Sequence, residues 1–368
     1  MVFIRKKFSK IILSTNENLI IYDTQDKTDN HVKIPAPIIP DNLSKGQIQA
    51  IQKQSREITS IEFSKDGDYF VISTENKQVI VYDNKLQVEK NVIVNRAASK
   101  VCFTPSNDVV VADKTGDVYL YKLHTDDPPT LLLGHQSVIL DITISECGKY
   151  IITCDRDEKI RVSCFPNAYN IVSFCLGHKE FVTKVTLVKG LLLSTSGDGT
   201  IRLWEFIGGK QLSMIDTNEH IDKDLLKSFA EEMDKEKVDV VALPITDMQI
   251  CDTDKLYIAV SIYRYDAIQL YTADVVSFKC DYVAKLSVNG PFTFYFNGDL
   301  YVLCKDFLVF NVNNDQFIQC QSPYVEIYGK YKGMLSLDKD NSITGLYKRK
   351  FDNVKEYLER KKQRLQAK

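Results

Sequence analysis

The 368-residue sequence has a single tryptophan, only five histidines and few glycines and prolines. It also has no apolar run of about 18 residues, the length needed to cross a membrane, so we expect no membrane segment. We expect no secretory leader either, because Arg5, Lys6 and Lys7 follow a short apolar start. The formal net charge of −2 argues against a free-standing nucleic-acid binder.

The motifs of common catalytic sites are also missing. The chain has no phosphate-binding Walker loop, no Gly-x-Gly-x-x-Gly after a strand, no His-Glu-x-x-His and no Cys-x-x-Cys. Its nine cysteines are scattered and odd in number, which predicts reduced thiols in an intracellular protein. Cys102, Cys154 and Cys175 fall within apolar strand patterns, so we interpret them as core residues and not as nucleophiles.

One well-formed repeat unit is present between residues 176 and 204. A Gly177-His178 pair is followed by a β-rich run, a Ser-Gly-Asp-Gly turn and a second run that ends at Trp204. Gly197 and Gly199 permit the unusual backbone angles of a tight turn. The Asp198 carboxylate between them is placed to accept from backbone amides and from the histidine of the same unit. This order of features is typical of one blade of a WD-type β-propeller.

Positions equivalent to Trp204 recur along the chain. Each ends an apolar, β-rich run, and together they are Tyr22, Tyr82, Tyr121, Ser163, Tyr271 and Phe310. The spacings are 60, 39, 42, 41, 67 and 39 residues, and four of the six lie near the period of about 40 expected for four-stranded blades. The sequence therefore predicts an all-β fold, a seven-bladed WD-repeat propeller over residues 1–340.

The two long spacings predict insertions into this ring. Residues at about 25–57 contain three prolines and then a polar run, which indicates an inserted loop with a short helix. Residues at about 213–240 carry nine acidic and four basic side chains, with apolar residues at helical spacing, so we expect an inserted acidic helix. We also expect Met1 to Ile4 to close the ring by pairing with the last blade.

The C-terminal residues 341–368 predict a basic amphipathic helix. From Lys348 to Lys368 there are nine Lys or Arg and three Asp or Glu, and the apolar residues share one helical face: Tyr347, Phe351, Val354, Leu358 and Leu365. Such a helix after a propeller is either a docking helix or an RNA contact. A solvated, partly frayed helix is the remaining alternative.

Several segments together resemble one family. The run Asp155-Arg156-Asp157-Glu158-Lys159-Ile160-Arg161, flanked by Gly134-His135 and Gly177-His178, is similar to the non-catalytic WD-repeat subunit of the eukaryotic tRNA guanine-N7 methyltransferase. So is the tail, with Leu346-Tyr347-Lys348 and Lys361-Lys362-Gln363-Arg364-Leu365. The resemblance extends from about residue 96 to the C-terminus.

The resemblance implies a propeller without an active site. Such a subunit forms a heterodimer with a separate catalytic subunit, stabilises it, and helps to position tRNA for methylation of a variable-loop guanine. S-adenosylmethionine is then expected on the catalytic subunit, and this chain is expected to hold no cofactor, no metal and no catalytic residue. The implied location is the nucleus, with the cytoplasm left open, and no membrane is involved.

Propeller geometry places the loops between blades and the turns before the Trp-like strands on one face. Our hypothesis for the partner-binding surface is the mixed-charge set Arg156, Glu158, Lys159, Arg161, Lys179 and Glu180, because mixed charge suits a specific protein contact. In it, Arg161 bonds a carboxylate of the catalytic subunit. Our hypothesis for tRNA contact is the basic set Arg96, Lys100, Lys114, Lys348, Arg349, Lys350, Arg360, Lys361 and Lys362, which would hold phosphates without reading sequence. Solvated surface charge is the alternative for both sets.

Two other functions remain open at this stage. A general WD-repeat scaffold, such as a ubiquitin-ligase adaptor or a chromatin platform, has the same fold. An enzyme on a propeller would need titratable residues that converge at the central channel, and no motif indicates them. We interpret His135 and His178 as structural blade residues. We interpret Asp155 and Asp157 as turn carboxylates that bind backbone amides, and not as an acid–base pair.

Overall fold

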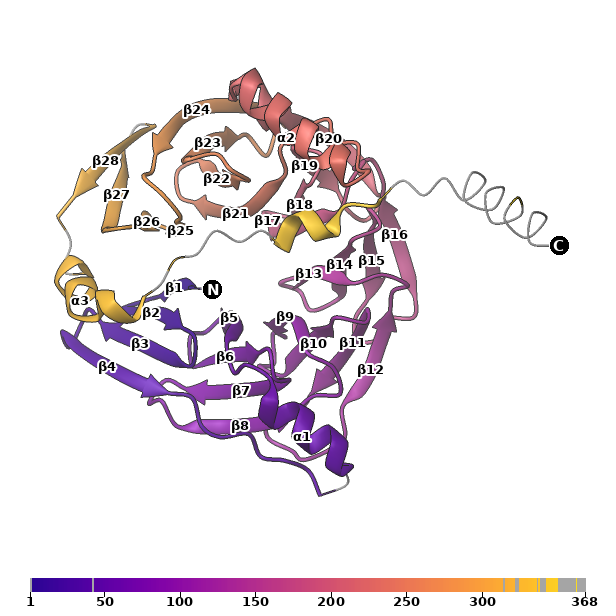
Figure 1. Ribbon diagram of the computed structural model, residues 1–368, viewed down its shortest axis with the longest axis vertical. Coiled ribbons are helices and arrows are strands. Elements are labelled where there is room, and N and C mark those ends of the chain that lie inside the picture. The colour runs from indigo at the N-terminus through magenta and orange to yellow at the C-terminus, as the bar shows by residue number, and fades with distance from the viewer. Residues whose placement is uncertain are drawn as a thin grey trace.

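Seven four-stranded antiparallel sheets follow one another around a ring, as Figure 1 shows. The prediction of a seven-bladed β-propeller is therefore confirmed. The computed structural model describes residues 2–41, 43–313, 315–321, 324–335, 337, 342–349 and 362. Within these residues no helix is both long enough and apolar enough to span a membrane.

Within each blade the four strands pair in chain order, and the first strand faces the central channel. From blade 1 to blade 7 the strands are β1 (Ile4–Lys7), β2 (Lys10–Thr15), β3 (Asn18–Asp23) and β4 (Thr28–Lys33); β5 (Ile58–Phe63), β6 (Tyr69–Thr74), β7 (Gln78–Asp83) and β8 (Val88–Ile93); β9 (Ala98–Phe103), β10 (Val109–Asp113), β11 (Asp117–Tyr121) and β12 (Thr130–Gly134); β13 (Ile139–Ile144), β14 (Tyr150–Asp155), β15 (Ile160–Cys164) and β16 (Ile171–Cys175); β17 (Val182–Val188), β18 (Leu191–Ser196), β19 (Thr200–Glu205) and β20 (Lys210–Asp216); β21 (Ile245–Asp252), β22 (Leu256–Ile262), β23 (Ala267–Ala273) and β24 (Cys280–Ser287); β25 (Thr293–Asn297), β26 (Asp299–Leu303), β27 (Phe307–Asn313) and β28 (Gln316–Cys320).

All seven positions aligned on Trp204 lie in the third strand of a blade. Ser163, the one without an aromatic ring, is in β15 and is fully buried. The second and third strands carry most of the buried apolar residues, and each pair of neighbouring blades shares one hydrophobic cluster, including the pair formed by blades 7 and 1. The ring is thus held together by packing between blades, which removes apolar area from water at every blade boundary.

The expected ring closure by strand exchange is wrong. Ile4 lies in β1 and pairs with Leu13 of β2, so the N-terminal strand belongs to blade 1. Residues 293–320 supply all four strands of blade 7, which leaves no vacant place for it. Side-chain contacts join the two blades instead: Lys6 Nζ donates to Tyr301 OH, and Asn297 Nδ2 donates to the Lys6 carbonyl.

Both insertions are shorter than the sequence spacing suggested. Residues 28–33 already form β4, so the first insertion begins after them and contains helix α1 (Lys45–Lys53). Residues 210–216 form β20, and the second insertion consists of a short 3₁₀ turn, η1 (Thr217–His220), and helix α2 (Lys223–Lys235). The Asp222 side chain caps α2, while Phe229 and Met233, four residues apart, bury one face of the helix.

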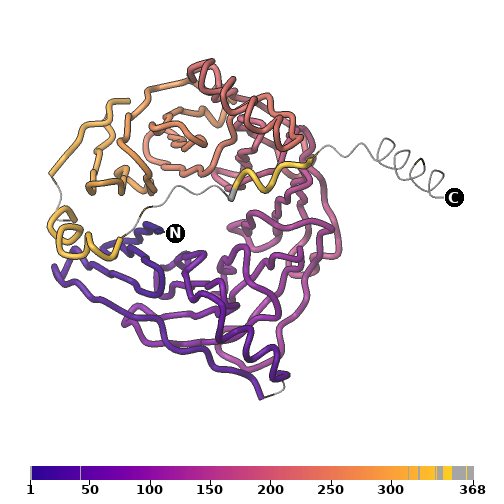
Figure 2. The backbone as a smooth tube through the Cα atoms, viewed as in Figure 1, coloured from indigo at the N-terminus to yellow at the C-terminus, as the bar shows by residue number. Residues whose placement is uncertain are grey.

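The described C-terminal residues lie at two places on the ring. Helix α3 (Tyr324–Tyr331) and the turn η2 (Lys332–Met334) lie beside blades 7 and 1, where Tyr324 contacts Tyr22 edge-on. The turn η3 (Ser342–Leu346) and residues 347–349 lie across the ring, near blades 4 to 6 (Figure 2). The predicted basic helix falls on residues 341–368, of which 341, 350–361 and 363–368 lie outside the described residues.

Candidate functional site

A buried hydrogen-bond network fixes the loop at the start of blade 5. His178 Nδ1 lies 3.1 Å from an Asp198 oxygen and His178 Nε2 lies 2.8 Å from Ser194 Oγ, which also accepts from Trp204 Nε1 at 2.8 Å. Asp198 also accepts from the Lys179 amide. Burial raises the pKa of Asp198, but the hydrogen bonds from His178 and Thr200 outweigh it and hold that pKa well below its ordinary value. His178 is therefore a structural residue, as predicted.

Blade 4 contains a smaller version of the same network. His135 Nδ1 lies 2.8 Å from Asp155, and His135 Nε2 lies 2.8 Å from Thr153 Oγ1. Asp155 also accepts from the amides of Asp157 and Lys159, at 2.9 and 3.1 Å, which confirms its interpretation as a turn carboxylate. The network has no indole, because Ser163 occupies the tryptophan position.

Arg161 of β15 lies next to this vacant aromatic position. Its Nε donates to Ser163 Oγ at 2.9 Å, Nη1 to the Gly134 carbonyl at 3.2 Å and Nη2 to the Ala168 carbonyl at 2.8 Å. All three acceptors are neutral, and no carboxylate of the described residues forms an ion pair with Arg161. Burial lowers the pKa of the Arg161 guanidinium, because nothing nearby compensates the desolvated charge. Arg161 thus has unused capacity for an external carboxylate.

Exposed apolar side chains lie near this arginine, on the outermost strands of blades 3 and 4 and in the segments next to β16. The cross-strand partner of Arg161 is Phe174 of β16, and β12, whose end binds Arg161, carries Leu131. We call the set the apolar flank; its members are 39 to 72 per cent exposed, and they are Leu131, Tyr169, Ile171, Phe174 and Leu176. Apolar surface around an arginine is typical of protein–protein interfaces. This flank was not predicted from the sequence, although apolar residues in an outermost strand were a usable signal.

The predicted partner-binding residues divide into three groups in the structure. Arg156, Glu158 and Glu180 gather around the C-terminal residues 346–348: Arg156 donates to the carbonyls of Leu346 and Tyr347, and Glu158 accepts from Lys348 at 2.7 Å. Burial and the charge of Glu158 raise the pKa of Glu180 to about 7, while Lys348 lowers it. Lys159 and Lys179 are exposed, and Arg161 faces the apolar flank.

The predicted tRNA-contact residues are also not all in one place. Arg96 and Lys114 are exposed at the start and in the turn of blade 3, where Lys114 forms an ion pair with Glu75 at 2.8 Å. Lys100 is separated from them, because its side chain enters the central channel. Lys348 and Arg349 are exposed, but Lys348 binds Glu158 of the propeller and Arg349 binds Glu236, just past α2. Lys362 is exposed, whereas Lys350, Arg360 and Lys361 lie outside the described residues.

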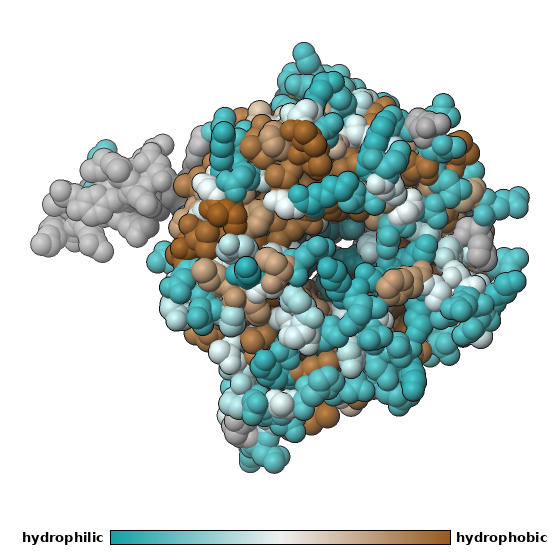
Figure 3. All heavy atoms as spheres, turned by 180° about the vertical axis from the view of Figure 1, so that it is seen from behind, coloured by the Kyte–Doolittle hydropathy of each residue, from teal (hydrophilic) through white to brown (hydrophobic). Residues whose placement is uncertain are grey.

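The central channel is lined by charged side chains that the sequence analysis did not identify. A cavity of about 390 Å³ lies among the innermost strands, and Figure 3 shows hydrophilic residues bordering the opening of the ring. From blade 1 to blade 6 the charges alternate, one per blade, and they are Arg5, Glu62, Lys100, Asp141, Lys184 and Asp247. A charged residue in six successive innermost strands was the signal that the sequence offered.

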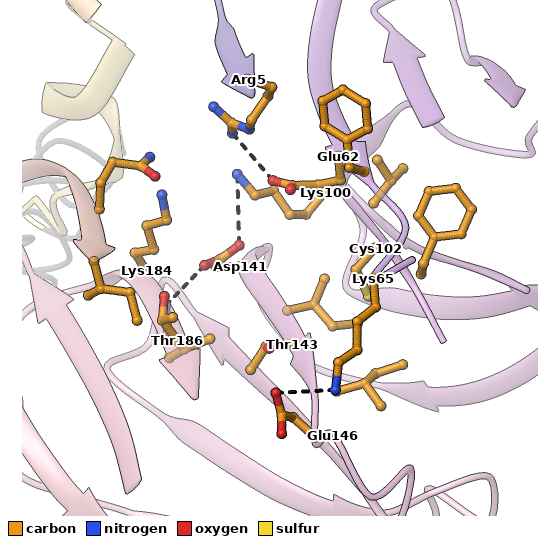
Figure 4. Close-up of a pocket in the computed structure, with 18 of the residues that line it drawn as sticks. Arg5, Glu62, Lys65, Lys100, Cys102, Asp141, Thr143, Glu146, Lys184 and Thr186 are labelled. Atoms are coloured by element: carbon orange, nitrogen blue, oxygen red, sulfur yellow. Dashed lines mark hydrogen bonds and ion pairs between the residues drawn. The ribbon is translucent and has the colours of Figure 1, made fainter. Parts of the chain in front are cut away.

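These charges join neighbouring blades in pairs, as Figure 4 shows for the first two. Arg5 binds Glu62 at 3.3 Å, Lys100 lies 3.8 Å from Asp141, and Lys184 binds Asp247 at 2.6 Å. Titratable groups therefore do converge at the channel, but as ion pairs across blade boundaries. Among the described residues no group of His, Cys, Asp and Glu has an arrangement that could hold a metal ion.

Comparison with known proteins agrees with this geometry. The pattern of the family described as the tRNA methyltransferase TRM82 WD40 domain matches residues 14–130 and 125–292. The chain is 33% identical over 338 residues to the tRNA (guanine-N(7)-)-methyltransferase non-catalytic subunit wdr4 of Xenopus laevis, covering 85% of this chain and 81% of that protein. It is 30% identical over 362 residues to the non-catalytic subunit wuho of Drosophila pseudoobscura pseudoobscura, covering 90% and 86%.

Solved structures add the fold alone. A chain of the crystal structure of the mitotic checkpoint complex superposes with a TM-score of 0.64 at 11% identity, over 83% of this chain and 88% of that one. The propeller is thus common to many proteins, whereas the two relatives in sequence given above are both named as non-catalytic subunits of this methyltransferase. The chain belongs to the WD40-repeat family of non-catalytic subunits of the tRNA (guanine-N(7)-)-methyltransferase.

Proposed function

We propose that this chain is the non-catalytic subunit that binds a catalytic tRNA guanine-N7 methyltransferase subunit as a heterodimer and holds it in its active form. The observation that carries the proposal is Arg161, a partly buried cation without a carboxylate partner in the described chain, set in a flank of exposed apolar residues. Membership of a family named for its non-catalytic subunits supports the same function.

The contact with the catalytic subunit follows from the chemistry of the flank. Leu131, Ile171 and Leu176 offer apolar area that loses water on binding, and Arg161 is placed to receive a carboxylate at the same surface. Lys159 and Lys179 are exposed and available for contacts at the rim. Arg156 is excluded from this role, because its guanidinium already binds the C-terminal carbonyls. S-adenosylmethionine and the methyl transfer are assigned to the partner.

The contact with tRNA is a second part of the proposal. Arg96, in the loop before β9, and Lys114, in the turn between β10 and β11, lie on the face that carries the loops between blades. The sequence from Lys348 to Lys368 contributes nine Lys or Arg. Cations of this kind hold phosphates and so set the register of the RNA on the complex. Lys100 is left out of this set, because it is bound within the channel.

Reconstitution of methyl transfer tests the assignment of roles. The chain alone, a catalytic subunit alone and the mixture are incubated with tRNA and labelled S-adenosylmethionine. We expect strong activity in the mixture only, and the same activity when the exposed Lys85 of blade 2 is changed to leucine. Methyl transfer by the isolated chain would contradict the proposal, and so would a catalytic subunit that is equally active without it. Co-purification with a different class of protein would favour a general scaffold.

Charge reversal tests the tRNA contact. Arg96→Glu with Lys114→Glu should weaken tRNA binding by the assembled complex and reduce the salt dependence of the affinity by about one unit per lost phosphate contact. Lys100→Glu is no suitable control, because it breaks a channel ion pair, so Lys85→Glu serves instead. Unchanged affinity and unchanged salt dependence in the double variant would exclude these two residues.

We also propose a nuclear location, with the basic tail contributing to import, since short basic runs act as localisation signals. A fluorescent fusion of the full chain should accumulate in the nucleus. Replacing Lys361 and Lys362 with uncharged residues should reduce that accumulation. An even distribution of the unsubstituted fusion would contradict this part.

A further inference from the structure

Tyr347 is the last buried residue of the segment 342–349, in which Ile343 is also buried. Its side chain is 3 per cent exposed, while the next two residues, Lys348 and Arg349, lie in solvent. The Tyr347 hydroxyl donates to the Gly197 carbonyl at 3.2 Å, and its ring meets Phe181 edge-on, with 4.9 Å between the ring centroids. Tyr347 therefore ties the C-terminal region to the β18–β19 turn and to the loop before β17 of blade 5, next to the buried Ile343.

Arg156 holds the main chain on either side of this tyrosine. Its Nε donates to the Leu346 carbonyl at 2.8 Å and its Nη2 donates to the Tyr347 carbonyl at 3.1 Å. Two charge-assisted bonds from one planar guanidinium fix direction as well as position. Residues 342–349, which we call the strap, are thus held by blade 4 through the backbone and by blade 5 through the ring.

The inserted helix α2 completes the enclosure. Phe229 of α2 is fully buried. The centroid of its ring lies 6.3 Å from the ring centroid of Tyr347 and 5.5 Å from that of Tyr263. Arg264 of blade 6 lies over the Phe229 ring and binds Glu232 of the same helix with two hydrogen bonds. The insertion, which interrupts the blade period, therefore packs on the strap. We call Phe181, Gly197, Phe229 and Arg156 the Tyr347 socket.

The first cations after the socket meet carboxylates on both sides. Lys348 binds Glu158 at 2.7 Å and Asp157 at 3.3 Å, and Arg349 binds Glu236, just past α2, at 3.0 Å. Ion pairs as exposed as these contribute little to affinity, so the anchoring comes from the buried ring and the Arg156 bonds. The pairs orient the chain as it leaves the socket, near β18 and the end of blade 4 (Figure 1).

We propose that Tyr347 is a positioning residue for tRNA binding, which fixes the point on blades 4 and 5 where the chain leaves the propeller toward its basic C-terminal sequence. Seven of the nine Lys or Arg between residues 348 and 368 follow Arg349, and they start from this point. Ile343, four residues earlier, packs in the same hydrophobic cluster, and the attachment before it is α3, beside blades 7 and 1. The inference rests on the proposed function, and it assigns the inserted helix the task of closing the socket.

The test uses full-length chains assembled with the catalytic subunit. Tyr347→Ala empties the socket, Tyr347→Phe keeps the ring and removes one hydrogen bond, and Tyr331→Ala removes an equal ring from α3 at the other attachment. Steady-state methylation gives KM for tRNA and kcat, tRNA binding at several salt concentrations gives the salt dependence, and tryptic cleavage after Lys348 reports release of the strap.

Tyr347→Ala should accelerate cleavage after Lys348, raise the KM for tRNA roughly tenfold and reduce the salt dependence by about 0.7 to 0.9 per lost phosphate contact. The kcat at saturating tRNA and the yield of heterodimer should not change, and the other two variants should resemble the wild type. If Tyr347→Ala lowers solubility, Arg156→Gln, which releases the carbonyls and keeps the ring, should shift KM in the same direction.

Faster cleavage with unchanged KM and unchanged salt dependence would overturn the inference, because the strap would then be released without consequence for tRNA. A wild-type chain that fails to stimulate methylation would instead contradict the proposed function. The two failures are therefore distinguishable within one set of measurements.

Discussion

Changing Arg161 to leucine separates an internal role of this arginine from a role in binding the catalytic subunit. Within the chain the change removes three hydrogen bonds to neutral acceptors, those of Ser163, Gly134 and Ala168. At 0.5–1.5 kcal/mol net for each bond, the free energy of unfolding should fall by about 1.5–4.5 kcal/mol. Urea unfolding of the isolated chain measures this part.

The effect on the complex is a separate loss of binding free energy. Removing one partner of a desolvated charge pair typically costs about 2–5 kcal/mol of binding free energy. That corresponds to a Kd raised by about 30-fold to several thousandfold. Calorimetric titration with the catalytic subunit, at a temperature where both variants are folded, measures it. The Kd of Arg161→Lys should lie between those of the wild type and Arg161→Leu, because a single ammonium group cannot satisfy three carbonyl or hydroxyl acceptors and a carboxylate together.

The control is Lys85→Leu, which removes an exposed cation from a turn of blade 2 and should leave Kd unchanged. An Arg161→Leu variant that loses stability as calculated but binds the catalytic subunit with wild-type Kd would refute the reasoning. Arg161 would then serve only to replace the missing aromatic ring of blade 4.

The networks and the socket give further expected outcomes. His178→Ala should lower the free energy of unfolding by about 1.5–3 kcal/mol, because it removes a hydrogen bond to the buried Asp198 carboxylate. His135→Ala should cost less, because blade 4 lacks the tryptophan link. Equal losses in urea unfolding would contradict this. Glu180→Gln should not change stability below about pH 4.5 and should raise it above pH 7. The reason is that burial and the charge of Glu158 raise the pKa of Glu180 to about 7, so the charged form of Glu180 disfavours the folded state. Thermal melts at pH 4 and pH 8 that show no such difference would contradict this prediction. Gly197→Ala should destabilise the chain by about 1–3 kcal/mol and expose Lys348 to trypsin, because a Cβ at this position would lie 2.6 Å from the Phe181 ring. An unchanged cleavage rate would contradict this, because the Phe181 ring would then move aside without releasing the strap.

The fold could be predicted because blade structure is local in sequence. The Gly-His pair, the Asp turn and the third-strand residue of blade 5 lie within 28 residues, and the network among His178, Asp198 and Trp204 closes within that unit. The same spacing located Ser163 correctly in a third strand without an aromatic residue to mark it. The bounds of the insertions were less accurate, since the outermost strands β4 and β20 are largely polar and have no periodic signal.

The features that the sequence did not reveal are contacts between distant parts of the chain. Arg156 and Tyr347 are 191 residues apart, and Tyr347 and Gly197 are 150 residues apart. No local pattern indicates that the strap returns to blades 4 and 5. Lys100 was grouped with Arg96 and Lys114 as a predicted tRNA contact, but alternation along β9 turns its side chain into the channel. The predicted ring closure by the N-terminal strand was also wrong. Whether blade 7 has room for that strand depends on how many strands residues 293–320 supply, and the N-terminal sequence does not indicate this number.

Hydrogen exchange of the chain with and without the catalytic subunit tests the central claim most directly. The claim is that the outer strands of blades 3 and 4, with Arg161 at their centre, face the partner. It predicts slower exchange in peptides that cover β12 and residues 160–176, and unchanged exchange in β3 and β28 of blades 1 and 7. Slower exchange confined to blades 1 and 7, with the flank around Arg161 unaffected, would contradict it.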